Sequence, residues 1–171
     1  MNALSRPANH GAQSDRDVWE ALARLPDPEI PVLSIIDLGI VRFVRRSPEG
    51  ELHVGITPTY SGCPATDLIR RTVRDALDAL GREDAVIEEV LAPAWTSDWI
   101  TAEGRRKLRE FGIAAPPAGS TGPRGVVSEV HECPRCGSAR TQRVSEFGST
   151  PCKAHYRCLA CLEPFDQFKC L

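Results

Sequence analysis

Up to residue 113, hydrophobic and polar positions follow two periods, and their order predicts a small α+β domain. Apolar residues at helical spacing predict a first helix that begins near Ser14 and ends at Pro26. The preceding residues 1–13 are polar, small and aperiodic, so we expect them to be disordered. The same patterns then predict strands ending near Arg46, at 52–57 and at 86–91, and helices at 64–80 and 101–111.

A change in composition divides the chain in two. Residues 114–127 are rich in Pro, Gly, Ser and Ala, which is typical of a linker. The linker would separate the α+β domain at 14–113 from a mostly β module at 128–171. That module is too short to build a sizeable apolar core, so we expect a bound metal to supply its folding energy.

Cysteines dominate the C-terminal module, which holds six of the seven in the chain. Four of them form two C-x-x-C pairs: Cys133, Cys136, Cys158 and Cys161. Two thiolates three residues apart on a tight turn converge on one point, so the pairs predict a tetrahedral zinc site. A closed four-thiolate shell leaves no open position, and such a site is structural. An iron–sulfur or rubredoxin-like iron centre is the alternative for the same ligands.

Two further cysteines of the module, Cys152 and Cys170, are not needed by this zinc site. Each is either an ordinary buried side chain or part of a second, more labile metal or redox site. The pattern does not decide between these alternatives.

The remaining thiol, Cys63, follows a predicted strand and directly precedes Pro64. If Pro64 begins a helix, Cys63 is its N-cap, where free N–H groups and the helix dipole favour a nucleophilic or iron-binding thiolate. An inert structural cap is the equally weighted alternative. Asp27 and Glu29 lie in a turn between prolines, where carboxylates serve either as acids and hard ligands or only as solvated turn residues.

Composition and charge narrow the function classes. The chain has 171 residues, 26% of them charged, with a net charge of -2 that favours neither nucleic acid nor an anionic membrane as partner. We expect a cytoplasmic protein, because the sequence has no bilayer-spanning apolar run and begins without the apolar core of a signal peptide. In a reducing compartment the cysteines are metal ligands or working thiols. P-loop, dinucleotide-binding, Gly-x-Ser-x-Gly and His-Glu-x-x-His motifs are absent, which argues against a free-standing enzyme.

Three motifs of the first domain resemble the MIP18 family, also called DUF59. They are the segments at 27–31 (Asp-Pro-Glu-Ile-Pro), 36–41 (Ile-Asp-Leu-Gly-Ile-Val) and 57–64 (Thr-Pro-Thr-Tyr-Ser-Gly-Cys-Pro). The resemblance implies a small α/β sandwich tied to iron–sulfur cluster assembly. It also implies a functional pocket, formed here by Asp27, Glu29, Thr57, Thr59 and Cys63, that holds iron or a cluster transiently.

Further motifs extend the resemblance to nearly the whole chain. Segments at 93–101, 104–108, 145–150, 152–154 and 163–170 are similar to the PaaD (or PaaJ) family of bacterial phenylacetate degradation. That family implies an accessory component of the phenylacetyl-CoA epoxidase, a ring 1,2-epoxidase. Its partners would be the di-iron oxygenase or the iron–sulfur flavin reductase, and a homodimer is also open. The implied role is maturation of a metal centre rather than epoxidation.

Two rival functions remain. The protein could be a non-catalytic structural subunit of the epoxidase complex, which needs no chemistry at Cys63. A nucleic-acid-binding ribbon follows from fold analogy alone and fits poorly with the pI of about 6.1.

Overall fold

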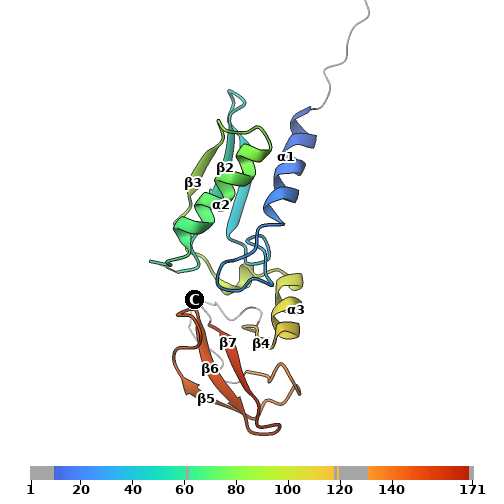
Figure 1. Cartoon of the computed structure of the whole chain (residues 1–171), viewed down its shortest axis with the longest axis vertical. Coiled ribbons are helices and arrows are strands. Elements are labelled where there is room, and N and C mark those ends of the chain that lie inside the picture. Colours follow the sequence, from blue (N-terminus) through green and yellow to red (C-terminus); the bar gives the residue numbers. More distant parts are fainter. Residues whose placement is uncertain (1–9, 61, 118, 120–130, 170–171) are drawn as a thin grey trace, which may run out of the picture.

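The computed structural model describes residues 10–60, 62–117, 119 and 131–169, and these residues form two sheets, three α-helices and a short 3₁₀ helix, Ser97–Trp99 (Figure 1). The α+β class predicted from the sequence is confirmed. Within the described residues, no helix is long and apolar enough to cross a bilayer.

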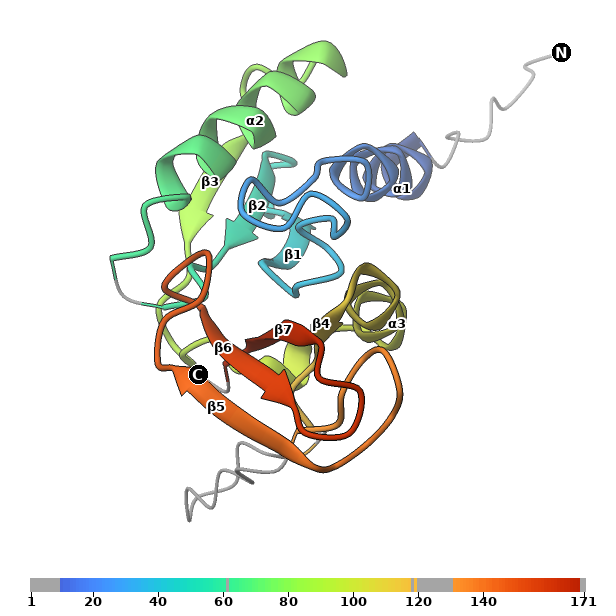
Figure 2. The ribbon, with the colours of Figure 1, turned by 60° about the horizontal axis from the view of Figure 1, so that its bottom comes forward.

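The first sheet contains three strands in the order β1-β2-β3: β1 (Val41–Arg46), β2 (Leu52–Ile56) and β3 (Val86–Glu89). β1 and β2 are antiparallel and form a hairpin, whereas β2 and β3 are parallel and are joined by α2 (Thr66–Ala79). Helix α1 (His10–Leu22) lies beside α2, and both helices cover the same side of the sheet (Figures 1 and 2). The buried stripe of α2 is Ile69, Val73 and Leu77.

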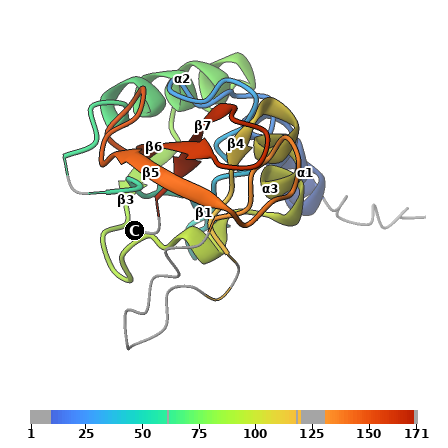
Figure 3. The ribbon, with the colours of Figure 1, turned by 90° about the horizontal axis from the view of Figure 1, so that it is seen from below.

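The second sheet has four strands in the order β4-β7-β6-β5, seen from below in Figure 3. Its strands are β4 (Ile113–Ala114), β5 (Thr141–Ser145), β6 (Lys153–Cys158) and β7 (Pro164–Phe168). β5, β6 and β7 form an antiparallel meander, and β4 pairs with β7 in parallel. One face of this sheet buries a small aromatic cluster, in which Tyr156 stacks on Phe165 at a centroid distance of 5.8 Å.

The two halves of the chain share one core. Phe168 of β7 and Cys152, just before β6, are buried within the same apolar cluster as α1, α2 and the first sheet. Phe168 is 1% exposed, and its ring lies 6.0 Å from that of buried Trp95. The Trp95 indole also donates a 2.8 Å hydrogen bond to the Leu38 carbonyl. The ribbon is therefore docked on the first half by apolar packing.

Helix α3 (Ala102–Phe111) carries the chain from one half to the other and is anchored at Asp37. Lys107 donates to the Asp37 carboxylate at 2.7 Å, and the Thr101 amide donates to the Asp37 carbonyl at 2.9 Å. The backbone of α3 approaches this loop so closely that a Cβ at Gly104 would lie 2.8 Å from the same carbonyl oxygen. Any larger residue at that position would push the helix away.

Several element boundaries differ from the sequence predictions. Helix α1 begins at His10, so residues 10–13 are helical rather than disordered; residues 1–9 lie outside the described part. The third strand ends at Glu89 instead of continuing to residue 91. Ala114, predicted to begin the linker, belongs to β4 because pairing with β7 satisfies its backbone. Residues 118 and 120–127 of the predicted linker also lie outside the described residues.

Candidate functional site

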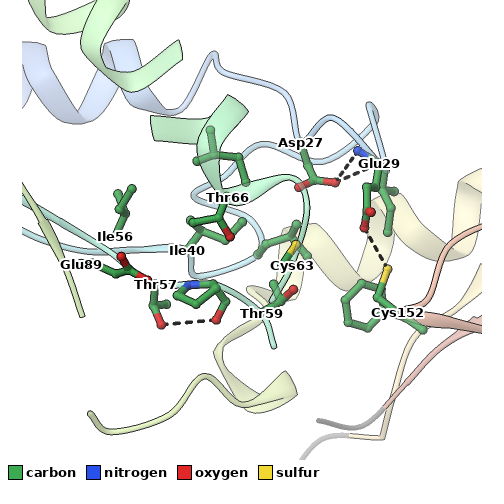
Figure 4. A pocket seen from close by; sticks show the side chains of 15 residues that line it. Asp27, Glu29, Ile40, Ile56, Thr57, Thr59, Cys63, Thr66, Glu89 and Cys152 are labelled. Carbon is green, nitrogen blue, oxygen red and sulfur yellow. Dashed lines mark hydrogen bonds between the residues drawn. The ribbon is translucent and has the colours of Figure 1, made fainter. Parts of the chain in front are cut away.

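A pocket opens where the two halves of the chain meet, and it contains all five pocket residues expected from the first domain (Figure 4). They come from the turn after α1, from the end of β2 and from the loop before α2: Asp27, Glu29, Thr57, Thr59 and Cys63. The ribbon contributes Cys152 and Phe168. The loop between β5 and β6 lies beside the segment that enters α2, which places Cys152 at the pocket (Figures 1 and 2).

The pocket is narrow and mostly apolar. Its walls include Ile30, Leu38, Ile40, Ile56 and Ile69. The cavity in which the centre of a water-sized molecule can lie measures about 20 Å³. That is room for about one small species rather than an organic substrate.

Asp27 organises the acidic turn. It is 6% exposed, and its Oδ1 accepts hydrogen bonds from the amides of Glu29, at 3.0 Å, and Ile30, at 2.8 Å. Burial raises the pKa of Asp27, although the two backbone hydrogen bonds oppose this effect. These hydrogen bonds fix the backbone of the turn in which the half-buried Glu29 lines the pocket.

Cys63 lines the pocket but does not occupy the predicted helix cap. Helix α2 begins at Thr66 with Ala65 as its N-cap, and the Thr66 amide donates to the Cys63 carbonyl at 3.2 Å. The N-cap prediction is wrong because the chain makes one more turn after Pro64 before the helix begins. Since helix-terminus effects fade beyond the first turn, the chemistry of this half-buried thiol depends on the groups that surround it.

Two of those surrounding groups were not predicted as pocket residues. Cys152 is 3% exposed, and its thiol donates to the Glu29 carboxylate at a sulfur–oxygen distance of 3.3 Å. Burial, followed by the contact with Glu29, raises the pKa of Cys152 to about 12. The Tyr60 hydroxyl is buried and makes no hydrogen bond of full geometry among the described residues, although the Cys63 thiol lies within its reach. Burial, together with the nearby Cys63, raises the pKa of Tyr60 to about 12.

The sequence offered a partial signal for both residues. Tyr60 lies within the segment at 57–64 that resembles the MIP18 family, and Cys152 was left over from the zinc pattern. No local period connects position 152 with position 29, so only the docked ribbon reveals their contact. Cys170, the other spare thiol, lies outside the described residues.

The four cysteines of the C-x-x-C pairs lie at the far end of the ribbon and fit a structural zinc site. Their ligand atoms all lie within 4.8 Å of one another. The Sγ–Sγ distances are 3.8 Å for Cys133–Cys161 and 3.6 Å for Cys136–Cys158. Zn–S bonds of about 2.3 Å in a tetrahedron require sulfurs about 3.8 Å apart, so these positions suit zinc.

The two C-x-x-C turns have the same backbone form although their sequences differ. Gly137 has a φ of 71° after the first pair, and Leu162 has a φ of 66° after the second. In the second turn the Cys158 sulfur accepts from the amides of Ala160, at 3.3 Å, and Cys161, at 3.4 Å. These bonds lower the pKa of the Cys158 thiol and favour the thiolate that zinc requires.

Two family models match two separate parts of the chain. Residues 15–88 match the model described as "Iron-sulfur cluster assembly protein", and residues 117–169 match the model described as "PaaD zinc beta ribbon domain". A crystal structure of the domain of unknown function DUF59 from Bacillus anthracis has the fold of the first half. Its TM-score is 0.51 at 22% identity, over 57% of this chain and 92% of that chain. Fold and site thus define the class: an iron–sulfur cluster assembly (MIP18 or DUF59) domain followed by a zinc ribbon.

Curated relatives specify the family within that class. The chain is 51% identical to a putative subunit of the 1,2-phenylacetyl-CoA epoxidase of Escherichia coli K12, over 98% of this chain and 100% of the relative. It is 32% identical to an "Fe-S protein maturation auxiliary factor" of Porphyromonas gingivalis W83, over 58% of this chain and 95% of the relative. The chain belongs to the PaaD family.

Proposed function

We propose that this protein is a cytoplasmic accessory factor of phenylacetate catabolism that helps to assemble an iron–sulfur or di-iron centre in the phenylacetyl-CoA epoxidase. It does not itself catalyse the ring 1,2-epoxidation. The names of its relatives support both parts of the proposal, since one is a putative epoxidase subunit and another an Fe–S maturation auxiliary factor. The iron or cluster is cargo, which the protein holds and then passes to a client, meaning the epoxidase subunit that receives the metal.

The observation that carries the proposal is the gathering of Cys63, Glu29 and Asp27 around one pocket that is separate from the zinc site. A thiol and a carboxylate together can bind Fe²⁺, a cation of intermediate softness. Transfer requires that the client can compete for the metal, and incomplete ligation permits this. A closed four-thiolate shell does not, so we assign the ribbon zinc to scaffolding.

The ribbon would recognise the client, either the di-iron oxygenase or the iron–sulfur flavin reductase. Its hairpin β5–β6 exposes large apolar side chains, with Val144 61% and Phe147 64% exposed. Because the same hairpin leads into the pocket at Cys152, a client bound there would lie close to the cargo.

The test replaces Cys63 by Ser in a strain that lacks its own copy of the gene and must grow on phenylacetate. We expect the iron content of the client and growth on phenylacetate to fall to the level of the strain without the protein. As a control for folding, the purified variant should keep its zinc and its melting temperature. Normal client iron in the Cys63→Ser strain would overturn the proposal.

The name of the relative with 51% identity favours a second candidate, a non-catalytic structural subunit of the epoxidase complex. This function predicts stoichiometric co-purification with the other subunits. It also predicts that Cys63→Ser changes neither the complex nor its iron content, so the same strain distinguishes the two candidates.

A further inference from the structure

Three elements distant in the sequence bring reactive groups to the same side of the pocket. The turn after α1 contributes Glu29, the loop before α2 contributes Cys63, and the ribbon contributes Cys152. Tyr60, in the same loop as Cys63, is an electrostatic neighbour of all three. Figure 4 shows Cys63, Glu29 and Cys152 around the same space, with the Cys152 sulfur directed at the Glu29 carboxylate. The pocket is therefore incomplete without the ribbon.

Cys152 is buried in the core, yet its sulfur contacts two side-chain oxygens. Its sulfur lies 3.3 Å from Glu29 Oε2 and 3.0 Å from Thr150 Oγ1, although only 3% of the residue is exposed. A cysteine that serves only as a small apolar side chain needs neither contact. Burying a thiol against a carboxylate is instead suited to a group that loses its proton when a cation arrives.

The Tyr60 hydroxyl is a further polar group beside the thiols. Within the described part of the chain this buried oxygen makes no hydrogen bond of full geometry, and the Cys63 thiol, a weak acceptor, lies within its reach. A buried hydroxyl is better satisfied by a thiolate than by a neutral thiol. Its electrostatic neighbours are Cys63, Glu29 and Cys152. A hydroxyl in that position can donate to a thiolate formed in the pocket.

We infer that Cys152 is the second sulfur ligand of the pocket, so that a divalent cation of Fe²⁺ type binds between Cys63 of the first domain and Cys152 of the ribbon. Glu29 completes the ligand set, and the Tyr60 hydroxyl donates to one of the thiolates. This inference rests on the proposed function and extends it, because the cargo would then hold the two halves together at one site.

Binding of Fe²⁺ at this site requires neither an oxidant nor a reductant. One Fe²⁺ displaces one proton from each thiol, two Fe–S bonds form, and no electron is transferred. The Cys152 proton passes first to Glu29, to which the thiol already donates, and then to water, since Glu29 is only half-buried. The proton of Cys63, which is also half-buried, passes directly to water. The freed carboxylate then faces the cation as its third ligand. Release to a client reverses these steps.

The inference is tested with Co²⁺, whose thiolate-to-metal charge-transfer absorbance grows with the number of sulfur ligands. The full-length protein with its ribbon zinc retained is titrated anaerobically, alongside Cys63→Ser, Cys152→Ser and Cys152→Ala. Ser149→Ala is the matched control, because Ser149 lies in the same loop but bonds to Asp166, at 2.9 Å, rather than lining the pocket. Zinc content is measured for every variant, and retained zinc shows that the ribbon is folded.

We expect the absorbance per bound Co²⁺ to fall about twofold in Cys63→Ser and in both Cys152 variants, because one of two sulfur ligands is lost in each. The affinity should weaken at least about tenfold in the same variants. Ser149→Ala should bind like the wild type. In Tyr60→Phe the affinity should fall while the absorbance per Co²⁺ stays constant.

The outcomes separate this inference from the proposed function. If the absorbance per bound Co²⁺ is unchanged in the Cys152 variants but falls in Cys63→Ser, Cys152 is not the second sulfur ligand. The proposed function would still stand in that case. Unchanged cobalt binding in both Cys63→Ser and Cys152→Ser, or no binding by the wild type beyond the zinc site, would overturn both.

Discussion

The zinc site and the metal site that we propose in the pocket differ in how their ligand atoms are held. The four ribbon sulfurs lie within 4.8 Å of one another, and no other group of three or more metal-binding side chains is gathered so closely in the part of the chain that the structure describes. Two short turns assemble the zinc site, whereas the pocket depends on residues as distant as Glu29 and Cys152. Ligands assembled in advance retain a metal, and ligands that must move together can release it.

The two sites are nevertheless connected through the packing of the ribbon. Cys158 is a zinc ligand at one end of β6, and Cys152 precedes the other end of the same strand. Loss of the zinc should therefore disturb the pocket, whereas loss of the pocket thiols should leave the zinc in place. The following predictions test this asymmetry, from the largest expected effect to the smallest.

Removing a zinc ligand should have the largest effect. In Cys133→Ser the zinc is lost, and we expect the free energy of unfolding to fall by more than about 3 kcal/mol, because zinc binding contributes directly to folding. Zinc analysis and thermal unfolding measure both effects. A variant that loses zinc and keeps its stability would show that the ribbon folds by packing alone.

Truncating Phe168, which packs the ribbon against the first half, should have the second-largest effect on stability. Phe168 is buried between the halves, so Phe168→Ala should cost about 3–5 kcal/mol and weaken metal binding in the pocket. Phe147→Ala is the matched control, since Phe147 is 64% exposed and the Lys169 ammonium lies over its ring, 4.3 Å from the centroid. The control should cost less than about 1 kcal/mol in urea unfolding. Equal costs would contradict the shared core.

Asp37→Asn should have an intermediate, pH-dependent effect on the free energy of unfolding, because it removes the ion pair with Lys107 that anchors α3. Burial opposes ionisation of Asp37, but the hydrogen bonds from Lys107 and Ser34 outweigh it, so its pKa lies below the unfolded value of 3.8. The stabilisation is therefore complete above pH 3.8 and is lost as the pH falls through the lower, folded pKa. At neutral pH the variant should lose about 1–3 kcal/mol. Unfolding curves at several pH values should show a shallower acid dependence in Asp37→Asn, and an unchanged dependence would contradict the assignment.

A pair of turn variants should give the smallest effects, with opposite signs. Leu162 adopts a φ of 66° and is 60% exposed, so Leu162→Gly should stabilise the ribbon by about 0.5–1 kcal/mol through relief of backbone strain. Gly137→Ala should destabilise it by about 1 kcal/mol, since open space leaves only the backbone cost. Chemical denaturation of the zinc-bound protein measures both. A loss of stability in Leu162→Gly would mean that the Leu162 side chain contributes to packing.

The same contrast explains what the sequence could and could not predict. The zinc ligands follow from a fixed spacing, because a C-x-x-C turn is a local structure. The helical period likewise predicted α2, and the strand period predicted β2. Both elements are stabilised by apolar residues that recur along the chain at the period of the element and are buried. The helix cap assigned to Cys63 was wrong because a single extra turn after Pro64 leaves the apolar stripe unchanged. The place of Cys152 depends on how the ribbon docks, and no local pattern encodes that contact.

The central claim is that the ribbon zinc is scaffold and the Cys63 pocket holds the exchangeable metal. The most direct test is metal analysis of the wild type, Cys63→Ser and Cys133→Ser after anaerobic incubation with Fe²⁺ and gel filtration. We predict that the wild type carries zinc and iron, that Cys63→Ser loses iron alone, and that Cys133→Ser loses its zinc. Iron retained in Cys63→Ser, or zinc lost with it, would contradict the account.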